Sequence, residues 1–460
     1  MKTNRRTFLK TISAITAGTY CPQLILANTN QVDADYELIA QEAKVNLMSA
    51  GKATAYTYNG NIPAPVIKAK QGQRIRIKLI NQLKDQTTTT HWHGLRIANA
   101  MDGVPFISHP PIAPGQSFIY DFIPPDAGTF WYHPHINSLP QMARGMTGMF
   151  IVEEKQPLAF AADIPLGLKK WRLNSNGEFK TQQFVARKAA RHGTQGNWQT
   201  VNAKAKPSID IPAGGAIRLR FANLDNSVYY NIHVAHPAVT MLALDGMPLS
   251  PPRNQTDYQL GAGMRLDLGF IAPKQANTEI TILNKSAMGD EVLLTLKTRQ
   301  QQLPTTTQLP KLPKNPIAPP DLAQAETRTF TFDWDALASP AAPKQGRMPI
   351  FWSINQRSMT ELMMGKLGEP LTRLSLGKTY IFNLKNTSQY HHPIHFHGYS
   401  FTVLESDKRT IIPYIADTVM LGKNENIKIA FVADNPGKWM FHCHVIDHME
   451  TGLMGYIEVS

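Results

Sequence analysis

The sequence predicts an all-β protein made of three copies of one β-domain. Three segments share one pattern. Each begins with a turn glycine, continues with apolar residues at every second position and is followed within two residues by an asparagine. These segments are Gly72–Leu79, Gly214–Phe221 and Gly377–Leu384, which run into Asn81, Asn223 and Asn386. Alternation at period two is typical of a strand with one buried face. Because the pattern recurs at intervals of about 140 and 160 residues, it indicates an internal repeat of one domain.

The composition narrows the class of protein. The 460 residues suit about three domains of ordinary size. With 42% hydrophobic and 18% charged residues, the chain is neither disordered nor a multi-pass membrane protein, and we expect no integral membrane segment. The formal net charge is +13, but the basic residues are dispersed and no nucleic-acid recognition motif is found, so we expect no nucleic-acid partner.

The first 27 residues have the features of an export signal. Arg5 and Arg6 precede a moderately apolar run from Thr11 to Ala27. This arrangement resembles a bacterial twin-arginine signal, which exports folded proteins, and it predicts a periplasmic protein. An ordinary secretory signal with a chance arginine pair is the alternative. Cys21 lies in this leader and Cys443 is the only other cysteine, so no disulfide framework is expected within the mature chain.

The repeats divide the chain into domains. Domain one is expected at residues 34–154, domain two at residues 164–297 and domain three at residues 327–460. Residues 298–326, rich in proline and glutamine, predict an extended linker over the surface. Helices are expected to be few, and Ser358–Lys366 is the best short candidate.

A second repeat relates only the first and third domains. Gly128–His135 parallels Gly437–His444, and His91–Gly94 parallels His395–Gly398. These two domains therefore share a site that the middle domain lacks.

Histidines gather in four short motifs. The motifs are His91-x-His93, His133-x-His135, His392-x-x-His395-x-His397 and His442-Cys443-His444 with His448. Residues i and i+2 of a strand point to one face, so each His-x-His pair can present two imidazoles to one metal cluster. One such pair can arise by chance on a surface strand, but four pairs in repeated settings indicate metal ligands.

Cys443 must point to the face opposite His442 and His444. A thiolate with His392 and His448 makes a His₂Cys set, which is the ligand set of blue-copper electron-transfer sites. A structural zinc site has four protein ligands and no open position. A single cysteine that points away from the two flanking histidines does not fit such a site. Copper therefore explains the pattern.

The four motifs, in their order along the chain, resemble those of the multicopper oxidases, a laccase-like family, and the resemblance covers essentially the whole mature chain. It implies three tandem cupredoxin-like Greek-key β-sandwich domains and about four copper ions per chain. His392, Cys443 and His448 would bind the mononuclear blue copper, and His91 and His395 the single copper of a trinuclear cluster. The coupled pair of that cluster would be held by His93, His133, His135, His397, His442 and His444.

The resemblance also implies a mechanism. A reducing substrate gives one electron at a time to the blue copper near His448, and Cys443 passes each electron to the cluster, where O₂ is reduced to two waters. Asp102, the carboxylate after the first His-x-His-Gly motif, would relay protons. Asp102-Gly103 is also a common turn pair, so a purely structural role stays open.

The axial position of the blue copper is expected at Leu453, ten residues after Cys443. Without a thioether there, the copper should have a higher reduction potential than a Met-ligated one. Met454 is adjacent, and a shift of the register by one residue would place Met454 in the axial position instead.

Phenols and aromatic amines are the expected substrates, because Leu453 and the segment His448–Gly452 are similar to laccases. A metallo-oxidase acting on Fe(II) or Cu(I) is the alternative, although the chain lacks a long Met-rich insertion. An enzyme that oxidises Fe(II) would need acidic guides such as Asp447, Glu450 or Asp417. The methionines of one short segment, Met359, Met363 and Met364, are expected to form a packing face.

A copper-free relative with a structural or cell-division role is a remote alternative, and it predicts missing ligands, whereas every ligand position is filled here. We expect a monomer whose other partners are O₂ and a small reducing substrate. The remaining histidines are expected to be structural or solvated: His109, His192, His233, His236 and His391.

Overall fold

The computed structural model describes residues 33–180, 186–255, 257–301, 308–334, 349–359 and 365–460, and β-strands are its main elements. The predicted signal peptide, residues 1–27, lies outside the described residues, as does the centre of the predicted helix at Ser358–Lys366. No helix within the described ranges has the length and apolar character needed to cross a membrane.

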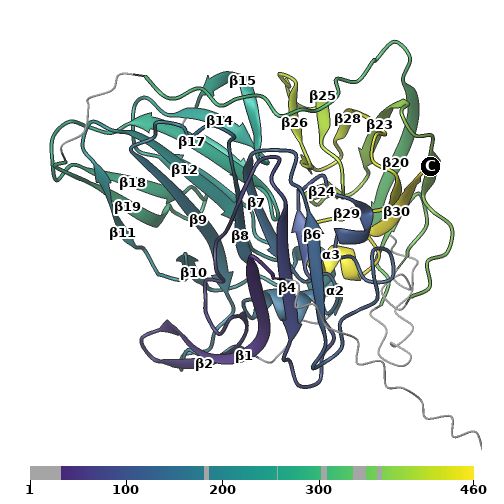
Figure 1. Cartoon of the computed structure of the whole chain (residues 1–460), viewed down its shortest axis with the longest axis horizontal. Coiled ribbons are helices and arrows are strands. Elements are labelled where there is room, and N and C mark those ends of the chain that lie inside the picture. Colours follow the sequence, from purple (N-terminus) through teal and green to yellow (C-terminus); the bar gives the residue numbers. More distant parts are fainter. Residues whose placement is uncertain (1–32, 181–185, 256, 302–307, 335–348, 360–364) are drawn as a thin grey trace, which may run out of the picture. The chain divides into compact units, whose positions relative to one another are not determined.

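The N-terminal strands form two four-stranded sheets (Figure 1). In spatial order, the first contains β2 (Gly51–Tyr58), β1 (Tyr36–Met48), β4 (Ile75–Asn81) and β6 (Ser117–Phe122). The second contains β3 (Ile67–Lys70), β8 (Gly148–Glu153), β7 (Gly128–His133) and β5 (His91–His93). A 3₁₀ turn, η1 (Asn99–Met101), and a helix, α1 (Ser138–Ala143), lie between these strands in the sequence.

The middle strands form a six-stranded and a five-stranded sheet. The six-stranded sheet contains β10 (Trp198–Val201), β9 (Ala162–Trp171), β12 (Ala216–Asn223), β17 (Arg265–Ile271), β14 (Thr240–Leu244) and β15 (Met247–Asn254). The five-stranded sheet contains β11 (Ser208–Pro212), β19 (Glu291–Arg299), β18 (Glu279–Asn284), β13 (Tyr230–Val234) and β16 (Asp257–Leu260). Helix α2 (Ala186–His192) lies between β9 and β10 in the sequence.

The C-terminal strands again form a six-stranded and a five-stranded sheet. The six-stranded sheet contains β21 (Trp352–Ile354), β20 (Glu326–Trp334), β23 (Thr379–Asn386), β28 (Asn426–Val432), β25 (Phe401–Ser406) and β26 (Tyr414–Ala416). The five-stranded sheet contains β22 (Thr372–Leu374), β30 (Met454–Val459), β29 (Gly437–Cys443), β24 (His392–Phe396) and β27 (Thr418–Leu421). Helix α3 (Ile446–Glu450) follows β29.

The three pairs of sheets repeat one topology. In one sheet of each pair, a parallel pairing joins β1 to β4, β9 to β12 and β20 to β23. In the other sheet, a parallel pairing joins β3 to β8, β11 to β19 and β22 to β30. All six sheets belong to the unit Ala34–Ser460. The all-β architecture is confirmed, and the domain boundaries stay predictions.

The asparagine at the end of each repeated strand makes the same set of hydrogen bonds in all three places. Asn81, Asn223 and Asn386 end β4, β12 and β23. Each side-chain amide donates two hydrogen bonds of 2.6–3.0 Å to backbone carbonyls. Each side-chain oxygen also accepts a hydrogen bond from the backbone N–H two residues later. The asparagine thereby satisfies backbone groups at the point where the strand ends.

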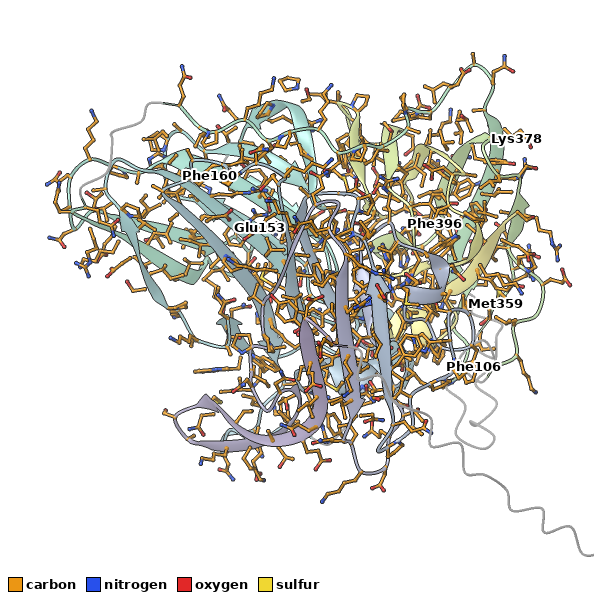
Figure 2. All side chains as sticks on the ribbon, viewed as in Figure 1. Phe106, Glu153, Phe160, Met359, Lys378 and Phe396 are labelled. Atoms are coloured by element: carbon orange, nitrogen blue, oxygen red, sulfur yellow. The ribbon has the colours of Figure 1, made fainter. Side chains whose placement is uncertain are left out.

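Apolar side chains from both sheets of each pair form a common core. In the C-terminal pair, Phe382 of β23 and Phe396 of β24 belong to one buried cluster. Figure 2 shows Phe396 among the interior side chains and Lys378, an exposed residue before β23, at the edge. The period-two pattern of the sequence places one face of each strand in such a core.

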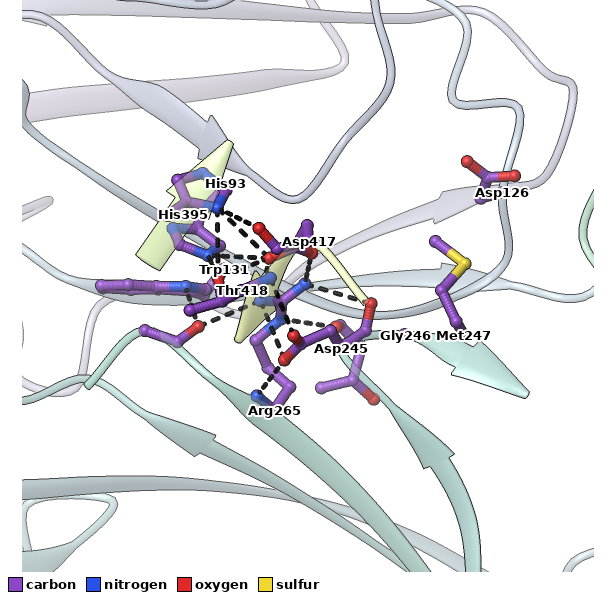
Figure 3. A network of polar contacts seen from close by, with 12 residues as sticks. His93, Asp126, Trp131, Asp245, Gly246, Met247, Arg265, His395, Asp417 and Thr418 are labelled. Carbon is purple, nitrogen blue, oxygen red and sulfur yellow. Dashed lines mark hydrogen bonds and ion pairs between the residues drawn. The ribbon is translucent and has the colours of Figure 1, made fainter. Parts of the chain in front are cut away.

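A buried charge network ties the middle strands to the C-terminal strands (Figure 3). Arg265 on β17 is fully buried and pairs with both carboxylate oxygens of Asp417, which lies between β26 and β27. Its guanidinium also lies 3.3 Å from an oxygen of Asp245 and donates to the backbone carbonyl of Thr129 on β7. One side chain therefore connects strands from all three pairs of sheets.

We predict that Arg265→Met destabilises the chain strongly, because Asp417 and Asp245 would then stay buried without their cation. The expected loss in the free energy of unfolding is about 3–5 kcal/mol. Urea unfolding of the copper-free full-length chain measures it. Arg373→Met is the matched control, since Arg373 pairs with Glu369 and Glu458 at the surface, where ion pairs contribute little. Equal effects of the two substitutions would contradict the prediction.

Candidate metal centres

Eight histidines from four strands and their ends converge on one interior site. His91 and His93 lie on β5, and His133 ends β7, with His135 two residues later. His395 lies on β24 and His442 on β29, and His397 and His444 directly follow these two strands. Antiparallel pairing sets His91 opposite His133 and His395 opposite His442. We call these residues the eight-histidine set. The expected placement of each His-x-His pair on one strand face agrees with this register.

The set spans the N-terminal and C-terminal sheets. The rings of His91 and His397 stack with centroids 3.9 Å apart, and those of His93 and His395 with centroids 3.8 Å apart. All eight side chains are buried. Three triads within the set have ligand atoms within 4.8 Å of one another: His91, His395 and His397; His91, His93 and His133; and His135, His397 and His442. His444 approaches His93, with ring centroids 4.8 Å apart.

The ring nitrogens of the set follow the pattern of metal ligands. Six imidazoles use one nitrogen on a protein partner; His91 Nδ1 donates to the Asp102 carbonyl at 2.8 Å, for example. In four of these six, the opposite nitrogen is buried and has no partner within the described residues. A partner that fixes one nitrogen leaves the lone pair of the other free for a metal.

Two rings show the fit to a cation most directly. His397 Nδ1 donates to Asp102 Oδ2 at 2.9 Å, and His442 Nδ1 donates to the Cys443 carbonyl at 2.8 Å. The remaining nitrogens, both Nε2, face each other at 3.0 Å. With both protons at Nδ1, two lone pairs meet at this distance, which is unfavourable unless a cation binds them.

Burial keeps seven of the eight imidazoles uncharged. It lowers the pKa of His395, and it lowers the pKa of six others well below the usual value, with the neighbouring imidazoles contributing in the same direction. Those six are His93, His133, His135, His397, His442 and His444. Neutral imidazole is the form that binds a metal.

A second group lies on the opposite face of β29. Cys443 Sγ is 3.5 Å from His392 Nδ1 and 3.6 Å from His448 Nδ1, and the two Nδ1 atoms are 3.1 Å apart. His392 lies on β24 and His448 on α3. All three side chains are buried, and burial raises the pKa of the thiol and lowers that of His448 to about 3. A bound cation would favour the thiolate here.

Leu453 and Met454 pack on different sides. Leu453 is fully buried in the same apolar cluster as Cys443, and its carbonyl accepts a hydrogen bond from the Cys443 N–H. Met454 belongs to another cluster, together with Trp131 and Met449. Leu453 therefore shares an apolar cluster with Cys443, and Met454 does not.

Asp102 contacts two members of the eight-histidine set. Besides its bond to His397, its other oxygen lies 3.2 Å from His91 Nδ1. The residue is buried. These contacts fix the orientation of both rings, and the proton-relay role stays a prediction.

Asp417, Asp447 and Glu450 are each engaged by protein partners. Asp417 bridges Arg265 and His93, with 3.2 Å to His93 Nε2 (Figure 3). Both oxygens of Asp447 accept hydrogen bonds from Thr194, at 2.7 and 2.8 Å. Glu450 accepts one from the Leu139 N–H at 3.0 Å.

A cavity of about 280 Å³ lies beside His448. Its described wall contains two tyrosines, Tyr229 and Tyr390, and none of the three carboxylates above. His192 and His391, which the sequence analysis set aside, also line it. Of the other histidines set aside, His109 stacks on Phe118 and His233 pairs with Asp257.

The middle segment contributes residues that the sequence analysis did not identify. Gly263 packs directly on the eight-histidine set, because a Cβ on it would lie 2.7 Å from the His444 ring. Its carbonyl accepts hydrogen bonds from Trp131 Nε1 and from Arg265. This segment carries no paired histidine motif, so no local pattern pointed to these contacts.

Comparisons with known proteins agree with this geometry. Family models described as multicopper oxidase match residues 40–157 and 340–460. The crystal structure of a multi-copper oxidase from Pseudomonas thermotolerans is 42% identical, with a TM-score of 0.84, and the match covers 93% of this chain and 100% of that one.

Relatives with different names are also similar. Laccase-1 of Fomitopsis schrenkii is 28% identical over 463 residues, covering 89% of this chain and 84% of its own length. The iron transport multicopper oxidase FET5 of Saccharomyces cerevisiae is 26% identical over 470 residues, covering 86% of this chain and 74% of its own. The two family models and the relative of 42% identity together show that this chain belongs to the multicopper oxidase family, whose members are copper-dependent oxidoreductases that use O₂.

Proposed function

We propose that the chain is a laccase-type enzyme, which couples four one-electron oxidations of phenols or aromatic amines to the reduction of O₂ to water. The observation that carries this proposal is the cavity beside His448, whose described wall offers tyrosines with apolar, polar and basic side chains and no carboxylate. An aromatic ring can lie in such a cavity within reach of His448.

We further propose how the chain holds about four copper ions, in the arrangement of the family. His392, Cys443 and His448 would hold one ion, and the eight-histidine set would hold the other three, with His91 and His395 on the single ion. The partnerless ring nitrogens support this assignment. Bound copper supplies the one-electron acceptor for the substrate and the four-electron reduction of O₂.

The chain itself links the two groups. Cys443 is joined through the backbone to His442 and His444, so one strand end carries ligand positions of both groups. Asp102 accepts a hydrogen bond from the Nδ1–H of His397 and thereby keeps the Nε2 lone pair of that ring available. His448 lines the cavity, and we propose that the substrate delivers its electron there.

A metallo-oxidase remains the alternative function. It would need ligands for Fe(II) or Cu(I) beside His448, and the described wall offers one thioether, that of Met420. Met359 is packed in an apolar cluster, in keeping with a packing role, and Met363 and Met364 lie outside the described residues. We propose that the protein is periplasmic, because the N-terminal sequence resembles a twin-arginine signal, and we further propose that it is a monomer.

Substrate preference tests the proposed function. We predict that kcat/KM for 2,6-dimethoxyphenol exceeds the values for Fe(II) and Cu(I) by at least about tenfold. Steady-state O₂ uptake by the copper-loaded enzyme, corrected for autoxidation, measures all three. Cys443→Ser should abolish the uptake and serves as the control for oxidation by loosely bound copper. A preference for either metal ion would instead establish the metallo-oxidase.

The axial position gives a second prediction. Leu453→Met should lower the reduction potential of the blue copper, because a thioether becomes available as an axial ligand. Redox titration of the blue absorption band measures the change. Met454→Leu is the matched control and should leave the potential unchanged. An unchanged or higher potential in Leu453→Met would contradict the assignment of Leu453 to the axial position. A changed potential in Met454→Leu would indicate that Met454 occupies that position instead.

A further inference from the structure

The cavity beside His448 has a strongly basic wall. Arg191 at the end of α2, His192, His391 before β24 and Lys423 before β28 all line it. Within the described part of the wall there is no aspartate or glutamate. Two permanent cations and two imidazoles therefore face one small space.

This positive charge is not neutralised by the neighbouring carboxylates. Arg191 and Lys423 form no ion pair with any carboxylate in the described ranges, and Arg191 instead stacks on Trp334 with 5.3 Å from its guanidinium carbon to the ring. Glu425, two residues from Lys423, is bound by Arg409 at 2.8 Å. The electrostatic potential of the cavity therefore attracts anions and repels cations.

Several polar atoms of the wall have no protein partner. They are Arg191 Nε, Ser227 Oγ and His391 Nδ1, all buried. Buried donors of this kind need an acceptor from water or from a ligand. A carboxylate supplies acceptor oxygens and the negative charge together.

We propose that this cavity binds an aromatic electron donor that carries a carboxylate, a phenolic acid, with the carboxylate toward Arg191 and Lys423 and the phenol oxygen toward His448. Tyr229 and Tyr390 provide faces for the ring. A volume of about 280 Å³ suits a molecule with a single ring. The inference rests on the proposed function, since the bound donor must be oxidised at His448.

The reaction balances with O₂ as the acceptor. Each phenolic acid loses one electron and its phenolic proton and becomes a phenoxyl radical, while the carboxylate stays unchanged. Four such oxidations release four electrons and four protons, and the reduction of one O₂ to two waters consumes both. The same basic wall disfavours Fe(II) and Cu(I), because it would repel these cations.

The experiment compares ferulate with methyl ferulate, which has the same phenol and no charge. In the copper-loaded full-length enzyme at low salt, we expect kcat/KM for ferulate to exceed that for the ester at least about fivefold, and added salt to narrow this ratio. Lys423→Gln and Arg191→Gln should each bring the ratio toward one, mainly by raising KM for ferulate. Lys423 is exposed, so its variant should fold even if Arg191→Gln does not.

Lys385→Gln is the matched control, because Lys385 is an exposed lysine of β23 that does not line the cavity. Its ferulate-to-ester ratio should equal that of the unmodified enzyme. Equal kcat/KM for acid and ester in the unmodified enzyme, or an unchanged ratio in Lys423→Gln, would overturn the inference.

A binding measurement separates this inference from the proposed function. 4-Methoxycinnamate keeps the ring and the carboxylate and lacks the oxidisable hydroxyl, so calorimetry reports its binding without turnover. Tighter binding than that of its methyl ester, lost in Lys423→Gln, supports the carboxylate site even if no phenol is oxidised. Oxidation of phenols without any binding of 4-methoxycinnamate would contradict the carboxylate site and would not contradict the proposed function.

Discussion

Eight imidazoles buried against one another are the constraint on which the rest of the structure depends. Burial lowers the pKa of seven of them, all but His91, and several ring nitrogens have no partner among the described residues. Such an arrangement is unfavourable for the protein alone. Paired strands can hold it, because β5 with β7 and β24 with β29 fix the register of the histidines. The fold holds a geometry whose unpartnered nitrogens are suited to metal ions.

The middle segment supports this geometry without contributing a histidine to it. Arg265 neutralises Asp417, and Asp417 in turn holds His93 through its side chain and His395 through its carbonyl. Gly263 allows the middle strands to approach the His444 ring. A change in the middle strands can therefore reach the metal ligands through a single buried carboxylate, which explains why three pairs of sheets serve one site.

Local regularities of the sequence were sufficient to predict the fold class and the grouping of the histidines. Period-two alternation assigns strand faces directly, so His442 and His444 separate from Cys443 without knowledge of the fold. The Arg265–Asp417 pair could not be found in this way, because its partners are 152 residues apart and neither lies in a repeated motif. The basic cavity likewise combines Arg191, His391 and Lys423 from separate loops and a helix end, which only the folded chain brings together.

The copper content of the purified, copper-loaded chain tests the central claim most directly. If the two groups of side chains hold copper as proposed, elemental analysis should find about four copper ions per chain, and about three in Cys443→Ser, which loses the thiolate of the His₂Cys group. About one copper per chain, or a content that Cys443→Ser does not change, would contradict the account.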